Sequence, residues 1–284
     1  MNIKIGAHVS AAGGLHRAFE RARAIGADCI QIFGSTPRSF TVKLPNQAEA
    51  ELFKKTRKET GIGPVYLHAP YLINLATPDK TLLKRSTTLL AAHLKIADII
   101  GAEGLIFHIG STLGKLDPEE AEGQVVAAMK MAMKGSAGRS ALVIENASGG
   151  GGKVGATPEE IGRIMEAIDS ARVKVCLDTA HAFEAGLIAK YDGENVERFA
   201  EEWRRQIGFE NIVALHANDS KTPFDSKSDR HENIGQGHIG LAGFKALARN
   251  KHFREKPWIL EVPGFAGDGP DKKNVDILKK CFEK

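Results

Sequence analysis

An alternation of short apolar runs with longer segments of helical period limits the folds open to this chain. The apolar runs are rich in Val, Ile and Leu, and each is short enough to form one buried strand. The segments between them place apolar residues three or four positions apart, as an amphipathic helix does. This alternation is typical of a parallel sheet built from strand–helix units. The expected strands span residues 3–9, 29–33, 65–68, 104–108, 141–145, 173–178, 212–216 and 258–262.

Two of the expected helices carry a clear start signal. Pro118 and Pro158 are each followed by two glutamates. Proline lacks the N–H that would be unsatisfied in a first helical turn, and acidic side chains there favour the positive end of the helix dipole. Both positions therefore predict helix N-termini.

Eight strand–helix units in 284 residues have the size and rhythm of a (β/α)8 TIM barrel, which is an α/β fold. No Pro- or Ser-rich linker and no shift in composition divides the chain, so we expect one domain over residues 1–284. A doubly wound open sheet shows the same alternation of strands and helices. The count of eight favours the barrel.

The three cysteines and the distribution of apolar residues bear on the cellular compartment. Cys29, Cys176 and Cys281 are odd in number, far apart and without CxxC spacing, which favours reduced thiols over disulfides or a thiolate metal site. The N-terminus is polar, and no apolar run approaches 18 residues. We therefore expect a soluble cytoplasmic protein without membrane contact. A net charge of +4 permits an anionic partner without requiring one.

Acidic and histidine side chains stand at the carboxyl ends of six consecutive expected strands, the third to the eighth. In a parallel barrel these ends meet at one rim, where functional groups collect. Further candidates follow the sixth and seventh strands, in the sequences DTAH and DRH. The candidate residues are His68, His108, Glu145, Asp178, His181, His216, Asp229, His231 and Glu261.

A single histidine at a strand end is more often a hydrogen-bonded structural residue than a ligand. Nine such side chains on one rim have no good packing explanation, because buried charges are costly and metal cations are the usual compensation. Five His and four Asp/Glu without Cys suit zinc or manganese, and the set is too large for one ion. We therefore expect more than one metal ion.

Two neighbouring divalent ions bridged by a carboxylate can activate water near neutral pH and clamp a phosphoryl group, so phosphodiester hydrolysis is the natural chemistry. Basic residues in the loops after the strands are compatible with a nucleic-acid substrate, although each alone is more simply a solvated charge. These residues are Lys43, Lys153, Lys221, Lys227 and Arg230.

Motifs along the whole chain resemble those of the endonuclease IV type of apurinic/apyrimidinic (AP) endonuclease, a zinc-dependent DNA-repair barrel. Three of them, HAPYLINL, LDTAHAF and DRHENIGQGHIG, are long and specific. The matching segments are GAHVSAAGG (6–14), PRSF (37–40), HAPYLINL (68–75), FHIGS (107–111), IEN (144–146), LDTAHAFEAG (177–186), LHANDSK (215–221), DRHENIGQGHIG (229–240) and LEVPG (260–264).

The resemblance implies about three zinc ions per chain, with manganese an option at one site, held by the nine rim residues. His68, His108 and Glu145 would hold the first ion. Glu145, Asp178, His216 and Glu261 would hold the second, and His181, Asp229 and His231 the third. Glu145 and Glu261 would be the catalytic carboxylates.

The implied reaction is hydrolysis of the phosphodiester bond 5′ to an abasic site in duplex DNA, leaving a 3′-hydroxyl and a 5′-deoxyribose phosphate. The resemblance further implies that Arg38, Tyr71 and Leu72 enter the DNA and fill the gap left by the flipped abasic nucleotide. We expect a monomer without an obligate protein partner, associated with the nucleoid when it acts on DNA. Phe40 and HIGST depart from the Trp and HPGSH of many relatives, near the expected DNA path.

Two other functions use the same pattern. A divalent-metal sugar isomerase or epimerase also gathers acids and histidines at strand ends, but it leaves the DRH pair and the HAPYLINL loop unexplained. A non-catalytic metal- or DNA-binding protein would be expected to lack some of the ligands. Among the other histidines, His8 and His238 are candidates to orient a ligand, and His16, His93 and His252 are expected to be structural.

Overall fold

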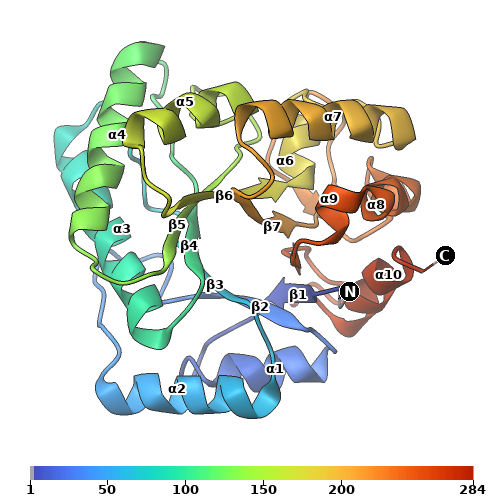
Figure 1. Ribbon diagram of the computed structural model, residues 1–284, viewed down its shortest axis with the longest axis horizontal. Coiled ribbons are helices and arrows are strands. Elements are labelled where there is room, and N and C mark those ends of the chain that lie inside the picture. Colours follow the sequence, from blue (N-terminus) through green and yellow to red (C-terminus); the bar gives the residue numbers. More distant parts are fainter. Residues whose placement is uncertain (1–2, 284) are drawn as a thin grey trace.

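The computed structural model describes residues 3–283, and its central feature is a closed barrel of parallel strands surrounded by helices (Figure 1). Neighbouring strands follow the order β1-β10-β7-β6-β5-β4-β3-β2. The barrel strands are β1 (Ile5–His8), β2 (Cys29–Phe33), β3 (Val65–His68), β4 (Gly104–Phe107), β5 (Ala141–Glu145), β6 (Val173–Asp178), β7 (Ile212–His216) and β10 (Trp258–Leu260).

Closure of the sheet depends on the pairing of its first and last strands. β1 pairs with β10 in parallel, with Ile5 opposite Trp258 and Ala7 opposite Leu260. A doubly wound sheet would leave two open edges instead. The prediction of a (β/α)8 barrel is therefore confirmed.

The helices form a ring around the barrel (Figure 1). Pro118 and Pro158 occupy first helical turns as expected, and the side chains of Asp117 and Thr157 cap these helices by accepting the N–H of Glu120 and of Glu160. The helices are α1 (Arg17–Ala24), α2 (Gln47–Thr60), α3 (Lys80–Ile100), α4 (Pro118–Lys134), α5 (Pro158–Ile168), α6 (Thr179–Glu184), α7 (Gly193–Gln206), α8 (Gly240–Arg249), α9 (Lys251–Arg254) and α10 (Lys272–Lys280).

The strand boundaries differ from the predicted ones in small but relevant ways. β4 and β10 end one residue before His108 and Glu261, so both side chains belong to the loops that follow these strands. The loop after β7 contains a small antiparallel pair, β8 (Asp219–Ser220) and β9 (His231–Glu232), which the sequence pattern did not predict. Two-residue strands are too short to show a period of two.

A separate apolar cluster, distinct from the main core, is made of one buried side chain from each of seven barrel strands. Because side chains alternate between the two faces of a strand, these residues face the barrel interior. On β1 the corresponding position is Gly6, where an added Cβ would collide with Cys29. The cluster contains Cys29, Tyr66, Ile106, Val143, Cys176, Ala214 and Ile259.

The main hydrophobic core fills the space between the barrel and its helices. Trp203 of α7 and Trp258 of β10 are fully buried in it. Within residues 3–283, no helix combines the length and the apolar character that crossing a membrane requires.

Candidate metal centre

A polar layer lies directly above the apolar layer of the barrel interior. Each of the seven apolar residues is followed two positions later by a polar one, and a two-residue step along a strand keeps the same face. On β1, His8 follows Gly6 in the same way. The seven polar residues are Gln31, His68, His108, Glu145, Asp178, His216 and Glu261.

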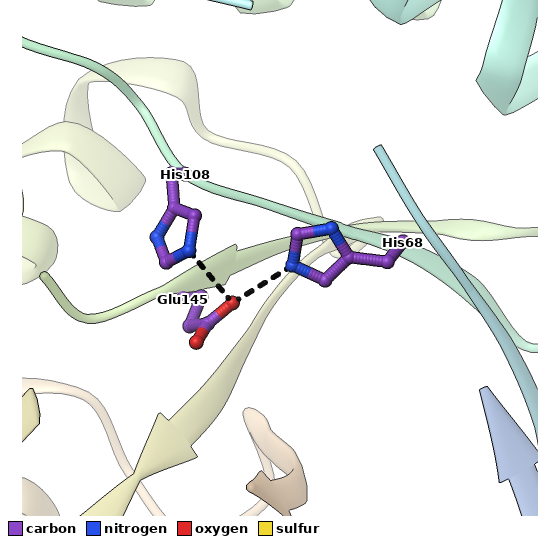
Figure 2. A group of neighbouring side chains, drawn as sticks. All are labelled: His68, His108 and Glu145. Atoms are coloured by element: carbon purple, nitrogen blue, oxygen red, sulfur yellow. Dashed lines mark hydrogen bonds and ion pairs between the residues drawn. The ribbon is translucent and has the colours of Figure 1, made fainter. Parts of the chain in front are cut away.

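The first group of side chains that could hold a metal ion consists of His68, His108 and Glu145. Both imidazoles point at one carboxylate oxygen (Figure 2): Nε2 of His68 is 3.1 Å and Nε2 of His108 is 3.5 Å from Glu145 Oε2. Ligands about 2.1 Å from a tetrahedral zinc ion lie roughly 3.4 Å apart. The three atoms are therefore spaced as donors to one ion.

The second group contains Glu145, Asp178, His216 and Glu261. Nδ1 of His216 lies 2.9 Å from Glu145 Oε1, 3.2 Å from Glu261 Oε2 and 3.8 Å from Asp178 Oδ2. His216, Glu145 and Asp178 are completely buried, and Glu261 is partly exposed. Three carboxylates around one imidazole in a buried site would repel one another without a cation.

The third group joins α6 to the loop that carries β9. Nε2 of His181 lies 3.3 Å from Asp229 Oδ1 and 3.4 Å from Nε2 of His231, and His231 is 3.7 Å from the same Asp229 oxygen. Asp178 and Glu184 also lie within reach of His181. The structure thus brings all nine candidate residues into one continuous cluster.

Proton affinities in the cluster are strongly shifted. Burial raises the pKa of the Glu145 carboxyl, but the adjacent His108 and His216 outweigh burial and hold this pKa well below its usual range. Burial lowers the pKa of His216 and of His181, but the surrounding acidic groups outweigh it and raise both pKa values well above the usual one. The raised pKa values of these histidines show that the surrounding carboxylates favour positively charged partners.

Gln31 is a member of the polar layer that sequence reasoning missed. Its fully buried side chain accepts a hydrogen bond from Nε2 of His216 at 2.7 Å and donates to Oε1 of Glu261 at 2.5 Å. Its Nε2 also lies 2.9 Å from Nδ1 of His8. The available signal was its position two residues after Cys29, the same step that separates each strand-end candidate from the apolar layer.

Two asparagines also support the cluster. Asn146 accepts the backbone N–H of Asp178 at 2.7 Å through its side-chain oxygen. Asn218 donates to Asp178 Oδ2 at 2.7 Å and accepts the backbone N–H of Glu261 at 2.8 Å. Each asparagine follows a strand-end candidate closely, which is the signal that would have identified it.

The DRHENIGQGHIG segment folds around the buried carboxylate of Asp219. This carboxylate accepts backbone N–H groups of Gly235, Gly237 and Ile239 at 2.9–3.1 Å. An acid in the segment LHANDSK therefore shapes a loop that begins ten residues later in the sequence.

The histidines outside the cluster differ in whether they contact it. The His8 ring lies 3.4 Å from Glu261 Oε1, consistent with a role in orienting that carboxylate, whereas His238 is exposed. His93 is buried on α3 and bonded to the Leu89 carbonyl, and His252 stacks on Phe209. His238 therefore offers no orienting contact to the cluster within the described residues.

The residues expected to contact DNA differ in their exposure to solvent. Phe40 packs under the guanidinium of Arg85, which lies 3.9 Å from its ring centre. Arg38 is exposed, and Leu72 is partly buried against the core. Tyr71 is 70% exposed. An aromatic ring so exposed in the free protein has its face available for stacking.

The basic loop residues are not equivalent. Lys43, Lys221 and Arg230 are exposed. Lys153 instead donates to Ser148 at 2.6 Å, and Lys227 donates to the Ala185 carbonyl and pairs with Asp225. The last two side chains are already engaged within the protein.

A hollow of about 420 Å³ opens over the cluster. Its walls include His68, His108 and Glu261, together with the exposed Tyr71. A second hollow of about 730 Å³, lined by the loops after β1 and β2, shares His8 and Phe33 with the first. Six of the nine candidate metal ligands thus line this first hollow, whereas Glu145, Asp178 and His216 are buried.

The fold and the acid–histidine cluster define a TIM-barrel protein with a metal-binding centre at the carboxyl ends of its strands. A family model described as xylose isomerase-like TIM barrel matches residues 19–281. A D-tagatose 3-epimerase-like protein superimposes with a TM-score of 0.71 at 20% identity, over 99% of this chain and 97% of that one. At this identity, the likeness shows the fold alone.

Closer relatives identify the family within this class. A probable endonuclease 4 of Persephonella marina is 38% identical over 280 residues, which are 99% of this chain and 97% of the relative. The crystal structure of endonuclease IV from Thermus thermophilus superimposes with a TM-score of 0.85 at 32% identity and covers 99% of both chains. The chain belongs to the endonuclease IV family, and it is an enzyme of the endonuclease class.

Proposed function

We propose that the protein is a DNA-repair enzyme that hydrolyses the phosphodiester bond 5′ to abasic sites in duplex DNA. The products would be a 3′-hydroxyl and a 5′-deoxyribose phosphate. About three zinc ions per chain would serve the reaction, with manganese an option at one site. The family, the cluster of nine ligand-type residues and the open hollow above it support this proposal.

The orientation of the Glu145 carboxylate carries the proposal. Its Oε2 faces His68 and His108, whereas its Oε1 lies 2.9 Å from His216 and 3.2 Å from His181. A carboxylate whose two oxygens face two separate sets of donors is suited to bridge two ions. Nucleases and phosphatases use such bridged pairs to hydrolyse phosphate esters.

Each residue of the cluster has a proposed place. His68, His108 and Glu145 would hold the first ion, and Glu145 with Asp178, His216 and Glu261 the second. The mutually close His181, Asp229 and His231 would hold the third. Bound zinc lowers the pKa of water and neutralises the negative charge of a phosphodiester.

The protein itself supplies positioning. Glu145 fixes the separation of the first two groups, and the partly exposed Glu261 lines the hollow, within reach of a bound phosphate. These two would be the catalytic carboxylates. Gln31 and Asn218 hold Glu261 from its side chain and from its backbone.

The rim would recognise the damaged DNA. Tyr71, Leu72 and Arg38 would enter the duplex and occupy the space left by the extruded nucleotide. Extrusion is inexpensive at an abasic site because no base has to be unstacked or unpaired. An open rim that admits bent DNA is compatible with a single-domain monomer without an obligate partner, acting on nucleoid DNA in the cytoplasm.

Incision of a duplex oligonucleotide that carries one tetrahydrofuran abasic analogue tests the proposal. This analogue cannot break by β-elimination, so a cut at its 5′ side reports hydrolysis. The cut is expected to disappear after prolonged chelation and to return with zinc or manganese. Absence of a cut with metal-loaded protein would contradict the proposal and favour a sugar isomerase or epimerase.

A further inference from the structure

Glu184 is a buried carboxylate beside the third group of the metal centre. It ends α6, three residues after His181, and residues three apart on a helix are neighbours on the same face. One carboxylate oxygen of Glu184 lies within 4.8 Å of ligand atoms of both His181 and Asp229. The strand-end pattern did not point to this residue because it lies at the end of a helix.

The two oxygens of Glu184 have different surroundings. Oε1 accepts hydrogen bonds from the Ser220 hydroxyl at 2.7 Å, the Thr222 hydroxyl at 3.3 Å and the Arg230 backbone N–H at 3.3 Å. Oε2 is buried and has no hydrogen-bond partner among residues 3–283. A buried carboxylate oxygen without a donor is costly, and a nearby cation is the usual remedy.

We infer that Glu184 is an additional protein ligand of the third metal site, beside His181, Asp229 and His231. This inference rests on the proposed function, because it presumes that the third site binds a metal ion. Two imidazoles and two carboxylates complete a four-donor set of the kind that binds zinc. The added carboxylate raises the affinity of this site for a divalent cation. It also adds an oxygen ligand, so the site favours manganese more than it would with three donors.

The same side chain also tethers the loop that presents the other ligands. Oε1 of Glu184 accepts hydrogen bonds from Ser220 and Arg230, which lie at the two ends of this loop. Asp229 and His231 are the residues on either side of Arg230. A loss of metal in a Glu184 variant could therefore arise from the loop rather than from the ligand. The experiment has to separate these two effects.

Three variants make the separation. Glu184→Gln keeps the shape of the side chain and an oxygen that accepts from Ser220, but it removes the negative charge. Ser220→Ala removes the shortest tether of the loop and keeps the carboxylate. His231→Ala removes a residue already assigned to the third site and reports whether that site exists.

The measurement is the zinc content per folded chain, by mass spectrometry, as each metal-loaded protein is titrated with a competing chelator. We expect Glu184→Gln to release one ion at a chelator concentration at least about 10-fold below that of the unchanged protein. Ser220→Ala should follow the unchanged protein, and His231→Ala should lose the same ion as Glu184→Gln.

Three results would overturn the inference. If Glu184→Gln keeps its third ion while His231→Ala loses it, Glu184 is not a ligand and the proposed third site stands. If Ser220→Ala releases the ion as readily as Glu184→Gln, the effect belongs to the loop. If neither Glu184→Gln nor His231→Ala loses an ion, the third site itself is wrong.

Discussion

Gln31 and His216 are hydrogen-bonded in the centre of the barrel, 2.7 Å apart, although 185 residues separate them in the sequence. Nε2–H of His216 donates to the amide oxygen of Gln31, so Nδ1, which lies 2.9 Å from Glu145 Oε1, is the nitrogen that would bind a metal ion when the ring is neutral. The amide nitrogen of Gln31 donates to Glu261. One neutral side chain therefore selects the tautomer of an imidazole and orients a carboxylate of the same group.

Replacing Gln31 with leucine should weaken the second metal site. The substitution keeps most of the volume but removes both hydrogen bonds, so His216 and Glu261 lose their fixed orientation. We expect a loss of about 10- to 100-fold in metal affinity or in incision rate, measured by chelator competition and by cleavage of the abasic duplex. Gln206→Leu is the control, because Gln206 lies on the outer helix α7 and donates to Glu202 of the same helix. Equal effects in both variants would contradict a specific role for Gln31.

Replacing Glu145 with glutamine should abolish incision by orders of magnitude while the protein stays folded. The amide has the same shape, but it is neutral and offers a donor where both oxygens face imidazoles. Circular dichroism checks the fold, and metal analysis followed by cleavage of the abasic duplex checks the loss. Glu119→Gln, at an exposed position of α4, should behave as the unchanged protein. Retained activity in metal-replete Glu145→Gln would count against bridging.

Replacing Tyr71 with alanine should weaken binding to the abasic duplex and leave the metal content unchanged. Loss of a stacking aromatic costs about 1–3 kcal/mol, which is roughly 5- to 150-fold in Kd. Fluorescence anisotropy with labelled duplex at fixed salt measures this change, and Arg38→Ala should act in the same direction. Met131→Ala is a matched control, since Met131 is 65% exposed on the outer helix α4. Loss of metal in the Tyr71 or Arg38 variant would show that the rim loops support the centre.

Metal binding should stabilise the protein more at pH 8 than at pH 6. Carboxylates with lowered pKa values, such as Glu145, stabilise the metal-free fold above their usual pKa, and this contribution is lost as the pH falls. His181 and His216 have raised pKa values, so their protonation stabilises the metal-free fold fully below pH 6.5. This contribution is lost as the pH rises through the raised pKa values of the folded protein. Bound metal requires neutral imidazoles and displaces these protons.

The corresponding measurement is the difference in Tm between metal-loaded and chelated protein in buffers of equal ionic strength. The difference should grow from pH 6 to pH 8. A difference that stays constant or shrinks would show that protons and metal ions do not compete for these histidines.

Much of the barrel could be predicted because parallel strands in a closed sheet are short, apolar and separated by helices with regular signals. Pro118 and Pro158 illustrate this, since a local chemical preference fixes each helix start. The β8–β9 pair could not be predicted, because it depends on contacts around the Asp219 carboxylate rather than on a local pattern.

The nine candidate ligands could be predicted although they are distant in sequence, because the carboxyl ends of the strands of a closed barrel lie next to one another. A search of the strand ends did not find Gln31, which stands in the middle of a strand within an apolar run, or Glu184, which ends a helix. Both positions become visible only when the interior layers and the face of α6 are known. The strand pattern does not predict a role that depends on which side chains are neighbours in the folded protein.

The pairing of β10 with β1 also governs when the centre can be assembled during synthesis. Glu261 follows the last strand of the barrel, and that strand takes its place against the first one. While the ribosome is still adding residues before 258, the nascent chain has an open sheet and lacks one carboxylate of the second group. The enzyme therefore gains its complete set of ligands only after residue 261 has been added and β10 has paired with β1, so a shorter nascent chain does not carry a complete nuclease centre.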